Sequence, residues 1–204
     1  MQAAYAFTTL LKDMVGPELK EHGFSKKGPT FYLWCKDNWG LINFQKSSSS
    51  TNESITFTVN LGVASSRLLK FFSSVKETGK PSIWDCHWRE RLGILLPEHN
   101  DKWWVLYRET DLESLHNLLS RNLRELVIPE IARYIGDEQL RDLWLEGKSP
   151  GLTNVQRLLY LSVLLKALGP LDYLGPVLEE LQRISIGTPA YSMVEVYLQK
   201  LNRY

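Results

Sequence analysis

Cysteine is scarce in this chain, and no segment resembles a leader or a membrane span. Cys35 and Cys86 are the only cysteines among 204 residues, too few for the disulfide framework of a small secreted protein. Residues 1–11 lack the basic and long apolar regions of a signal peptide, and no run approaches the roughly 20 apolar residues of a transmembrane helix. We therefore expect a cytoplasmic protein with two free thiols and no membrane association.

A marked excess of either charge is also missing. Lys and Arg total 24 against 23 Asp and Glu, which gives a net charge of +1. Proteins that bind nucleic acid through its phosphates usually carry a clear basic excess, so this balance argues against a nucleic-acid partner. The composition leaves the oligomeric state open.

Recognisable catalytic motifs are absent. The chain has no phosphate-binding glycine loop, no nucleophile elbow and no zinc-protease motif. Its four histidines never fall at metal-ligand spacing, so we expect no metal and no cofactor. Cys86 and His87 are neighbours, but adjacent side chains on a strand point to opposite faces, which disfavours a nucleophilic cysteine. No catalytic residue is predicted, and the sequence favours a non-enzymatic protein without deciding the question.

The strongest pattern present is an alternation with a period of two. Residues 55–63 place Ile, Phe, Val, Leu and Val at the odd positions and polar or small residues between them. Residues 30–36 and 39–46 extend the pattern, and Asp37–Asn38 suit a two-residue hairpin turn that pairs Leu33 with Ile42. The three strands then have one apolar face for the core and one face of amides, hydroxyls and aromatic rings.

That polar face is the first candidate site. Aromatic rings supply rigid contact area, and carboxamides both donate and accept hydrogen bonds. The predicted binding residues are Tyr32, Trp34, Asn43, Gln45, Thr58 and Asn60. The other interpretation is a solvated face of an antiparallel sheet, or one roofed by helices.

Cationic side chains form the second candidate, an anion site. Its residues are Lys26, Lys27, Lys46, Arg89 and Arg91. The lysines are expected at one end of the first hairpin, and the two arginines share a strand face. Such a site would belong to a protein, or an enzyme, that uses a small molecule or a phosphate ligand. Alternatively, the arginines pair with acidic residues such as Glu109 or Asp111.

The order of the patterns predicts an α+β fold. An N-terminal helix over residues 7–19 precedes an antiparallel sheet of about five strands, in which residues 88–95 and 102–108 form a second hairpin. Its tryptophans, Trp84, Trp88, Trp103 and Trp104, are expected in the core. From Asp111, a plausible N-cap, the period becomes about 3.6. We expect a sheet domain over residues 1–108 and an all-helical region over 109–204, packed on or beside the sheet as part of one compact unit rather than as an independent domain.

Several short motifs in the first half resemble a known family. They are Gly23–Gly28, Thr30–Tyr32, Asn43–Ser47 and Phe57–Gly62, followed by Trp88–Gly93 and Trp103–Trp104. Over roughly residues 7–107 the chain resembles the bacterial domain-of-unknown-function family numbered 4304. The resemblance implies a bacterial, cytosolic protein and supplies no catalytic residues, because the family has no established activity. The expected function is therefore a protein-binding or accessory module, toxin neutralisation being one such role, with an unknown protein partner.

Overall fold

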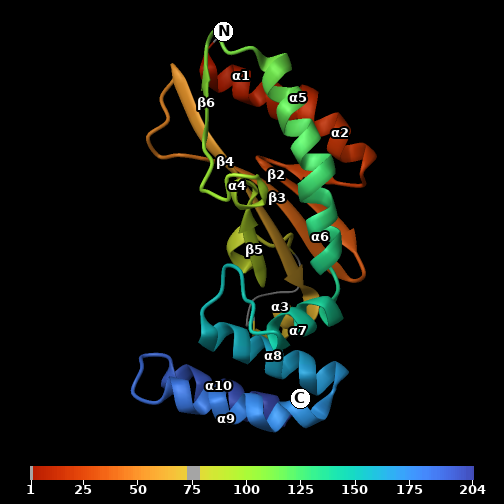
Figure 1. Ribbon diagram of the computed structural model, residues 1–204, viewed down its shortest axis with the longest axis vertical. Coiled ribbons are helices and arrows are strands. Elements are labelled where there is room, and N and C mark those ends of the chain that lie inside the picture. Colours follow the sequence, from red (N-terminus) through yellow and green to blue (C-terminus); the bar gives the residue numbers. More distant parts are fainter. Residues whose placement is uncertain (1, 73–78) are drawn as a thin grey trace.

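Six strands form one antiparallel sheet in the computed structural model, which describes residues 2–72 and 79–204. The strands are β1 (Ser25–Lys27), β2 (Thr30–Cys35), β3 (Asn38–Lys46), β4 (Ser54–Ser65), β5 (Trp88–Arg91) and β6 (Trp104–Tyr107). They lie in the order β1-β2-β3-β4, and β5 and β6 both pair with the far edge of β4. Helices precede the sheet and follow it (Figure 1). The predicted α+β class is confirmed, with β1 as a strand that the sequence did not reveal.

The N-terminal helix forms as predicted, with one irregular turn. It comprises α1 (Ala3–Thr9), a π-helical turn (Leu10–Met14) and α2 (Val15–Glu21). Pro17 has no N–H to donate to the preceding turn, which accounts for the widened turn just before it. Gly23, with φ of 83°, ends the helix, and the Phe24 N–H donates back to the carbonyl of Leu19.

The hairpin between β2 and β3 has the predicted faces but not the predicted register. Its turn is Lys36–Asp37, with φ of 51° and 59°, rather than Asp37–Asn38. Leu33 therefore pairs with Gly40 instead of Ile42. Two successive positive φ values are typical of a type I′ turn, whose twist matches that of the strands. The two-residue shift changes each partner but leaves every side chain on its predicted face, because side chains alternate with a period of two.

The predicted second hairpin does not form. β5 ends at Arg91, and Leu92–Leu95 form the short helix α4. β5 pairs with residues 60–63 of β4, whereas β6 pairs with residues 54–57. The prediction was wrong because β4 is 12 residues long and accommodates both strands end to end along one edge. β5 and β6 have four residues each, so β4 is a longer pairing partner for either strand than the other strand would be.

Of the remaining helices, one follows β4 and the others belong to the predicted helical region after Asp111. They are α3 (Ser66–Phe72), α5 (Leu112–Asn122), α6 (Ile128–Tyr134), α7 (Asp137–Leu145), α8 (Asn154–Leu168), α9 (Leu174–Ser185) and α10 (Tyr191–Asn202). The Asp111 carboxylate caps α5 by accepting the backbone N–H groups of Glu113 and Ser114. A π-helical turn (Leu123–Val127) joins α5 to α6, next to Pro129. Among the described residues, no helix has the length and apolar character needed to cross a membrane.

The main core lies on one face of the sheet. Ile42, Phe44 and the odd positions of residues 55–63 point into it and are buried. Helices α1, α2, α5 and α6 pack against this face, and the same cluster continues into α7 and α8. The approach is closest at Gly40, where a Cβ atom would lie 2.6 Å from Cγ2 of Ile131. Helices α5 and α6 are thus packed on the sheet, whereas α9 and α10 pack on α8.

Candidate functional site

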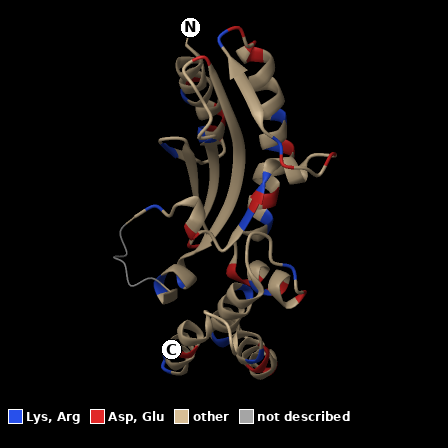
Figure 2. Cartoon of the chain, turned by 90° about the vertical axis from the view of Figure 1, so that its left-hand side faces the viewer, with Lys and Arg blue, Asp and Glu red and all other residues tan. Residues whose placement is uncertain are grey.

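The opposite side of the sheet, which we call the outer face, carries all six predicted binding residues. Its strand positions are Ser25, Lys27, Thr30, Tyr32, Trp34, Trp39, Leu41, Asn43, Gln45, Ser54, Thr56, Thr58, Asn60, Gly62, Ala64, Arg89, Arg91, Val105 and Tyr107. Helix α3 and the 3-10 turn Ile83–Asp85 contact this face through Leu69 and Ile83, near one end of it. Figure 2 shows the long curved strands running down the middle of the molecule.

A row of directly paired residues crosses this face from one edge strand to the other. Lys27 pairs with Thr30, Thr30 with Asn43, Asn43 with Asn60, and Asn60 with Arg91. Paired residues on neighbouring antiparallel strands project to the same side, so these five side chains form one continuous strip. We call this strip the amide row.

The amide row is linked by side-chain hydrogen bonds. Asn43 Nδ2 donates to Thr30 Oγ1 at 2.8 Å, and Asn60 Nδ2 donates to Asn43 Oδ1 at 3.3 Å and to Gln45 Oε1 at 2.9 Å. These bonds fix which way each carboxamide faces. In the described part of the chain, neither Asn60 Oδ1 nor Gln45 Nε2 has a hydrogen-bond partner. Asn60 Oδ1 can therefore accept a hydrogen bond from another molecule, and Gln45 Nε2 can donate one.

Two loops limit how much of the outer face is open. On one side of the amide row, the Lys80 ammonium lies 4.7 Å from the ring centroid of Tyr32, and a Cβ on Gly62 would lie 2.5 Å from Cys86 Sγ. On the other side, Thr58 Oγ1 donates to the Lys102 carbonyl at 2.8 Å. These loops therefore contribute to the burial of Tyr32 and Thr58, and Asn60 is also buried. Asn43 and Gln45 remain half-buried, and Trp34 is 51% exposed.

Tryptophan and arginine side chains border the open part. The Arg89 guanidinium lies 5.7 Å from the Trp84 ring and that of Arg91 lies 5.4 Å from the Trp103 ring. Trp34 packs edge-to-face on its cross-strand neighbour Trp39, with centroids 4.7 Å apart. Trp88 and Trp104 are buried in the core as predicted. The same prediction is wrong for Trp84, which is 70% exposed, and for the half-buried Trp103.

The five cations of the predicted anion site do not lie together. Lys26 and Lys46 point to the core side of the sheet, where their ammonium groups lie over the rings of Phe31 and Phe7. Lys27, Arg89 and Arg91 are on the outer face. This division follows from the alternation, because consecutive residues such as Lys26 and Lys27 face opposite ways.

The two arginines are already engaged, although not by Glu109 or Asp111. Arg91 forms an ion pair with Asp101, whose carboxylate also accepts the Trp103 indole N–H at 3.1 Å. Arg89 donates to the carbonyl of Gly151, in the loop before α8. In the part of the chain that is described, no three His, Cys, Asp or Glu residues are grouped in a way that could hold a metal ion.

Cys86 and His87 do not form a nucleophile–base pair. Burial raises the pKa of the Cys86 thiol, so the reactive thiolate is disfavoured. The imidazole Nδ1 of His87 accepts the backbone N–H of Ser65 at 3.0 Å, and its ring packs edge-to-face on Tyr160. Burial also lowers the pKa of His87 to about 3, which leaves it neutral. Both residues are therefore structural.

The neutral His87 predicts a specific loss of stability in acid. Its pKa is about 3 when folded and near 6.5 when exposed, so the unfolded state binds the extra proton between these values. Below about pH 6.5 the free energy of unfolding should fall by up to about 1.4 kcal/mol per pH unit, or about 2 kcal/mol by pH 5. In His87→Asn, which keeps an acceptor for Ser65, urea unfolding at pH 7 and pH 5 should show that much less acid sensitivity. An unchanged acid sensitivity would assign it to other groups.

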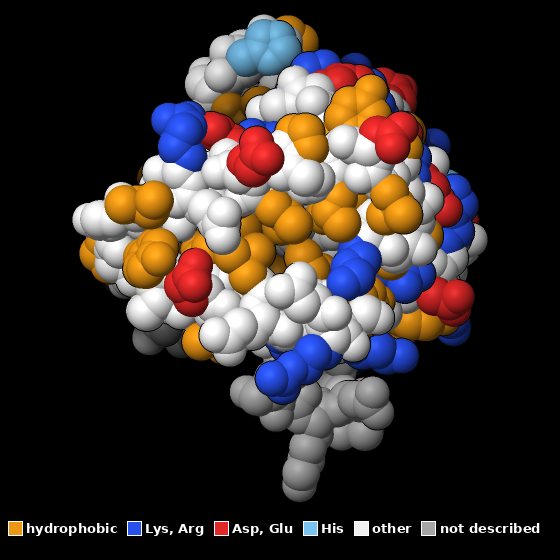
Figure 3. Space-filling view, turned by 90° about the horizontal axis from the view of Figure 1, so that it is seen from below, with side chains coloured by type: hydrophobic (Ala, Val, Ile, Leu, Met, Phe, Trp, Pro, Cys, Tyr) orange, Lys and Arg blue, Asp and Glu red, His pale blue; other side chains and the backbone are white. Residues whose placement is uncertain are grey.

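Two further regions carry mixed chemistry, and the first adjoins the outer face at Trp34 and Trp39. An open depression of about 1270 Å³ lies between the β2–β3 turn, α3 and the start of α7, but its Arg67 is paired with Asp137 at 3.0 Å. Helices α9 and α10 carry exposed apolar residues such as Val196. At the lower end of the molecule, hydrophobic side chains are interspersed with acidic and basic ones (Figure 3). Neither surface indicates one kind of ligand.

The sheet, together with α2, α5 and α6, lies within the match to a recognised family. Residues 15–136, more than half of the chain, match the family described as Domain of unknown function (DUF4304). The chain belongs to this family. The DUF4304 match runs beyond the expected end near residue 107 and includes α5 and α6, in keeping with the packing of α6 on Gly40. No curated protein and no solved structure matches the chain.

Sequence reasoning missed Lys27 and Trp103 as outer-face neighbours of the DUF4304 sheet. The role of Lys27 depends on β1, a three-residue strand whose only local signal is the turn at Gly28–Pro29. The exposed Val105 and Tyr107 of β6 were detectable, because they alternate with the buried Trp104 and Leu106. The sequence pattern was interpreted as one strand of a second hairpin. The outward-facing residues of β6 were therefore not predicted to lie beside those of β4.

Proposed function

We propose that this DUF4304 protein is a non-enzymatic protein-binding module whose outer sheet face is the binding surface. One observation carries the proposal: Trp34, Trp84 and Tyr107 are each at least half exposed on or beside this face, while the helices cover the other face. Isolated exposed aromatics are ordinary, but three around one sheet face form a candidate interface.

The composition of the surface supports the proposal. Trp, Tyr and Arg are the residue types that dominate binding energy at protein interfaces. Arg89 and Arg91 are stacked on tryptophan rings in the free protein, so they lose little side-chain freedom on binding. The amide row adds fixed hydrogen-bonding groups between the aromatic residues.

We also propose a reducing compartment, the bacterial cytoplasm, as the place of action. Both cysteines are free, and Cys86 is buried as a thiol. Toxin neutralisation is one accessory role that a protein-binding module of this kind could perform. A nucleic-acid partner is not part of the proposal, because the strands direct only three cations to the outer face.

Site-specific photo-crosslinking tests the proposed function. A benzophenone amino acid replaces Trp34 or Tyr107 on the outer face, or Tyr173 elsewhere; their exposed fractions, 51%, 50% and 53%, are closely matched. After irradiation in the native cells, we expect one shared protein adduct from positions 34 and 107 and none of that mass from position 173. Adding Trp84→Ala should lower the yield about tenfold, as loss of an interface anchor does.

Two results would count against protein binding by this face. One is the same adduct pattern at all three positions, which indicates random collision. The other is a yield that Trp84→Ala leaves unchanged, since Trp84 is 70% exposed and its removal should not disturb folding.

A further inference from the structure

We infer that the outer face binds an extended, acidic segment of its partner, which lies across the strands along the amide row. This inference rests on the proposed function and adds the chemistry and the spacing of the recognised segment.

The charges on the outer face are of one sign. The strand positions that point to this face include Lys27, Arg89 and Arg91 but no Asp or Glu. On the opposite face, the charged strand residues are Lys26, Lys46 and the acidic Glu90. Lys80, beside Tyr32, adds a fourth cation to the outer face. A partner that complements this surface carries carboxylates.

Two acidic groups beside this face already have hydrogen-bond partners within the protein. Asp101 is paired with Arg91 and bonded to Trp103, while Asp85 accepts the N–H and hydroxyl of Ser82. Arg91 donates one of its five N–H groups to Asp101, so it can still bind a second carboxylate. Lys27 has no ion-pair partner within residues 2–72 and 79–204.

The amide row suits the backbone of an extended peptide. Asn60 presents an unbonded carbonyl oxygen, and Gln45, bonded to it through Oε1, presents an unbonded NH₂ group. Together they can accept a peptide N–H and donate to a peptide C=O without regard to the side chain. Hydrogen bonds to the peptide backbone therefore supply general affinity. Lys27 and Arg91, at the two ends of the amide row, supply selectivity for acidic residues of the peptide.

The two ends of the row set the spacing of those acidic residues. Lys27 on β1 and Arg91 on β5 are separated by four strand spacings of about 4.8 Å, or roughly 19 Å in all. An extended chain advances about 3.3 Å per residue, so about six residues cover this distance. The expected motif has two Asp or Glu residues about six positions apart, on the same side of the extended segment.

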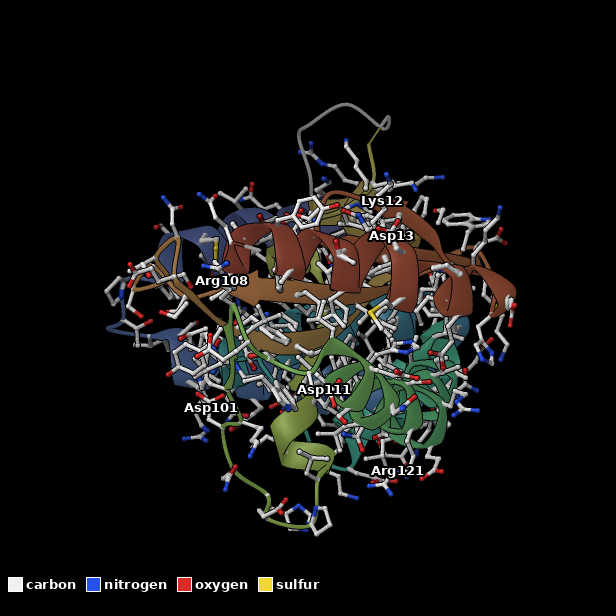
Figure 4. All side chains as sticks on the ribbon, turned by 90° about the horizontal axis from the view of Figure 1, so that it is seen from above. Lys12, Asp13, Asp101, Arg108, Asp111 and Arg121 are labelled. Atoms are coloured by element: carbon white, nitrogen blue, oxygen red, sulfur yellow. The ribbon has the colours of Figure 1, made fainter. Side chains whose placement is uncertain are left out.

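Selection from a phage-displayed library of random dodecapeptides tests the inference on the full-length protein. Wild-type protein should enrich peptides with two acidic residues at the expected spacing. The best synthetic peptide should bind Lys27→Glu with a Kd raised about fivefold or more, measured by fluorescence polarisation. Lys12→Glu is the matched control, because Lys12 is exposed and lies far from Asp101 (Figure 4); its Kd should change less than twofold. Arg91→Gln should abolish the preference for the acid at the other end.

The inference would be overturned if the enriched peptides lacked acidic residues or showed no preferred spacing between them. It would also be overturned if Lys27→Glu bound the best peptide with an unchanged Kd. An equal effect of Lys12→Glu would also overturn it, since net charge alone would then explain binding. If no acidic peptide is selected but the crosslinks at positions 34 and 107 form, only the acidic-segment inference fails. If those crosslinks are also missing, the proposed function itself fails.

Discussion

Phe57→Ala should cost about 3–5 kcal/mol of the free energy of unfolding, the range for removing a buried aromatic ring. Phe57 is fully buried, and its ring lies 5.2 Å from Phe7, 5.8 Å from Trp104 and 6.2 Å from Phe44. These residues come from α1, β3, β4 and β6, so the cavity would open where helix and sheet meet. Collapse around it is opposed because each neighbour is held by its own element.

Val105→Ala is the control for Phe57→Ala. Val105 pairs with Thr56, the neighbour of Phe57, but it faces outward and is 43% exposed. Its truncation should cost less than about 1 kcal/mol. Urea unfolding followed by tryptophan fluorescence measures both variants. Equal losses would mean that the two faces of β4 do not differ as described.

Asn38→Ala should cost about 3 kcal/mol or more, although it removes only a small polar side chain. Asn38 is 3% exposed; its Nδ2 donates to the Ile135 carbonyl at 2.8 Å and to Asp137 at 3.0 Å, and its Oδ1 accepts the Ser66 N–H at 2.9 Å. Each buried group left without a partner costs about 1–3 kcal/mol. The variant therefore disconnects β3 from the starts of α3 and α7 together.

Asn117→Ala serves as the comparison for Asn38→Ala. Asn117 is exposed on α5, and its replacement should change the free energy of unfolding by no more than about 0.5 kcal/mol. Chemical unfolding of both variants at pH 7 is the measurement. A loss below about 1 kcal/mol for Asn38→Ala would show that water replaces its three bonds.

The faces of the sheet were predictable even where the register was not. The alternation in residues 55–63 assigned Phe57 and Val59 to the core and Thr58 and Asn60 to the other side, and the burial of the odd positions agrees. The hairpin register was wrong by two residues. A two-residue error keeps the faces because the side-chain period is two, so Asn43 and Gln45 were still grouped with Asn60.

The strand partners and the bordering side chains were not predictable in this way. β5 and β6 each look like half of a hairpin, and only the length of β4 explains why both pair with it. Similarly, the contact of Arg91 with Trp103 depends on the path of the loop between β5 and β6. Local patterns contain no information about such long-range competition between partners.

By itself, the sequence determined the α+β class, the N-terminal helix, the capped helix after Asp111 and the two faces of the sheet. These follow from side-chain periodicity and from the conformational preferences of Gly, Pro and Asp, which are local. The tertiary structure alone decided that α1, α2, α5 and α6 pack on one face, that Lys27 and Arg91 end the same row, and that Trp84 is exposed and Trp103 half-buried. Those features depend on which distant segments pack together. That choice is made among all the contacts the chain could form, and local sequence patterns do not contain it.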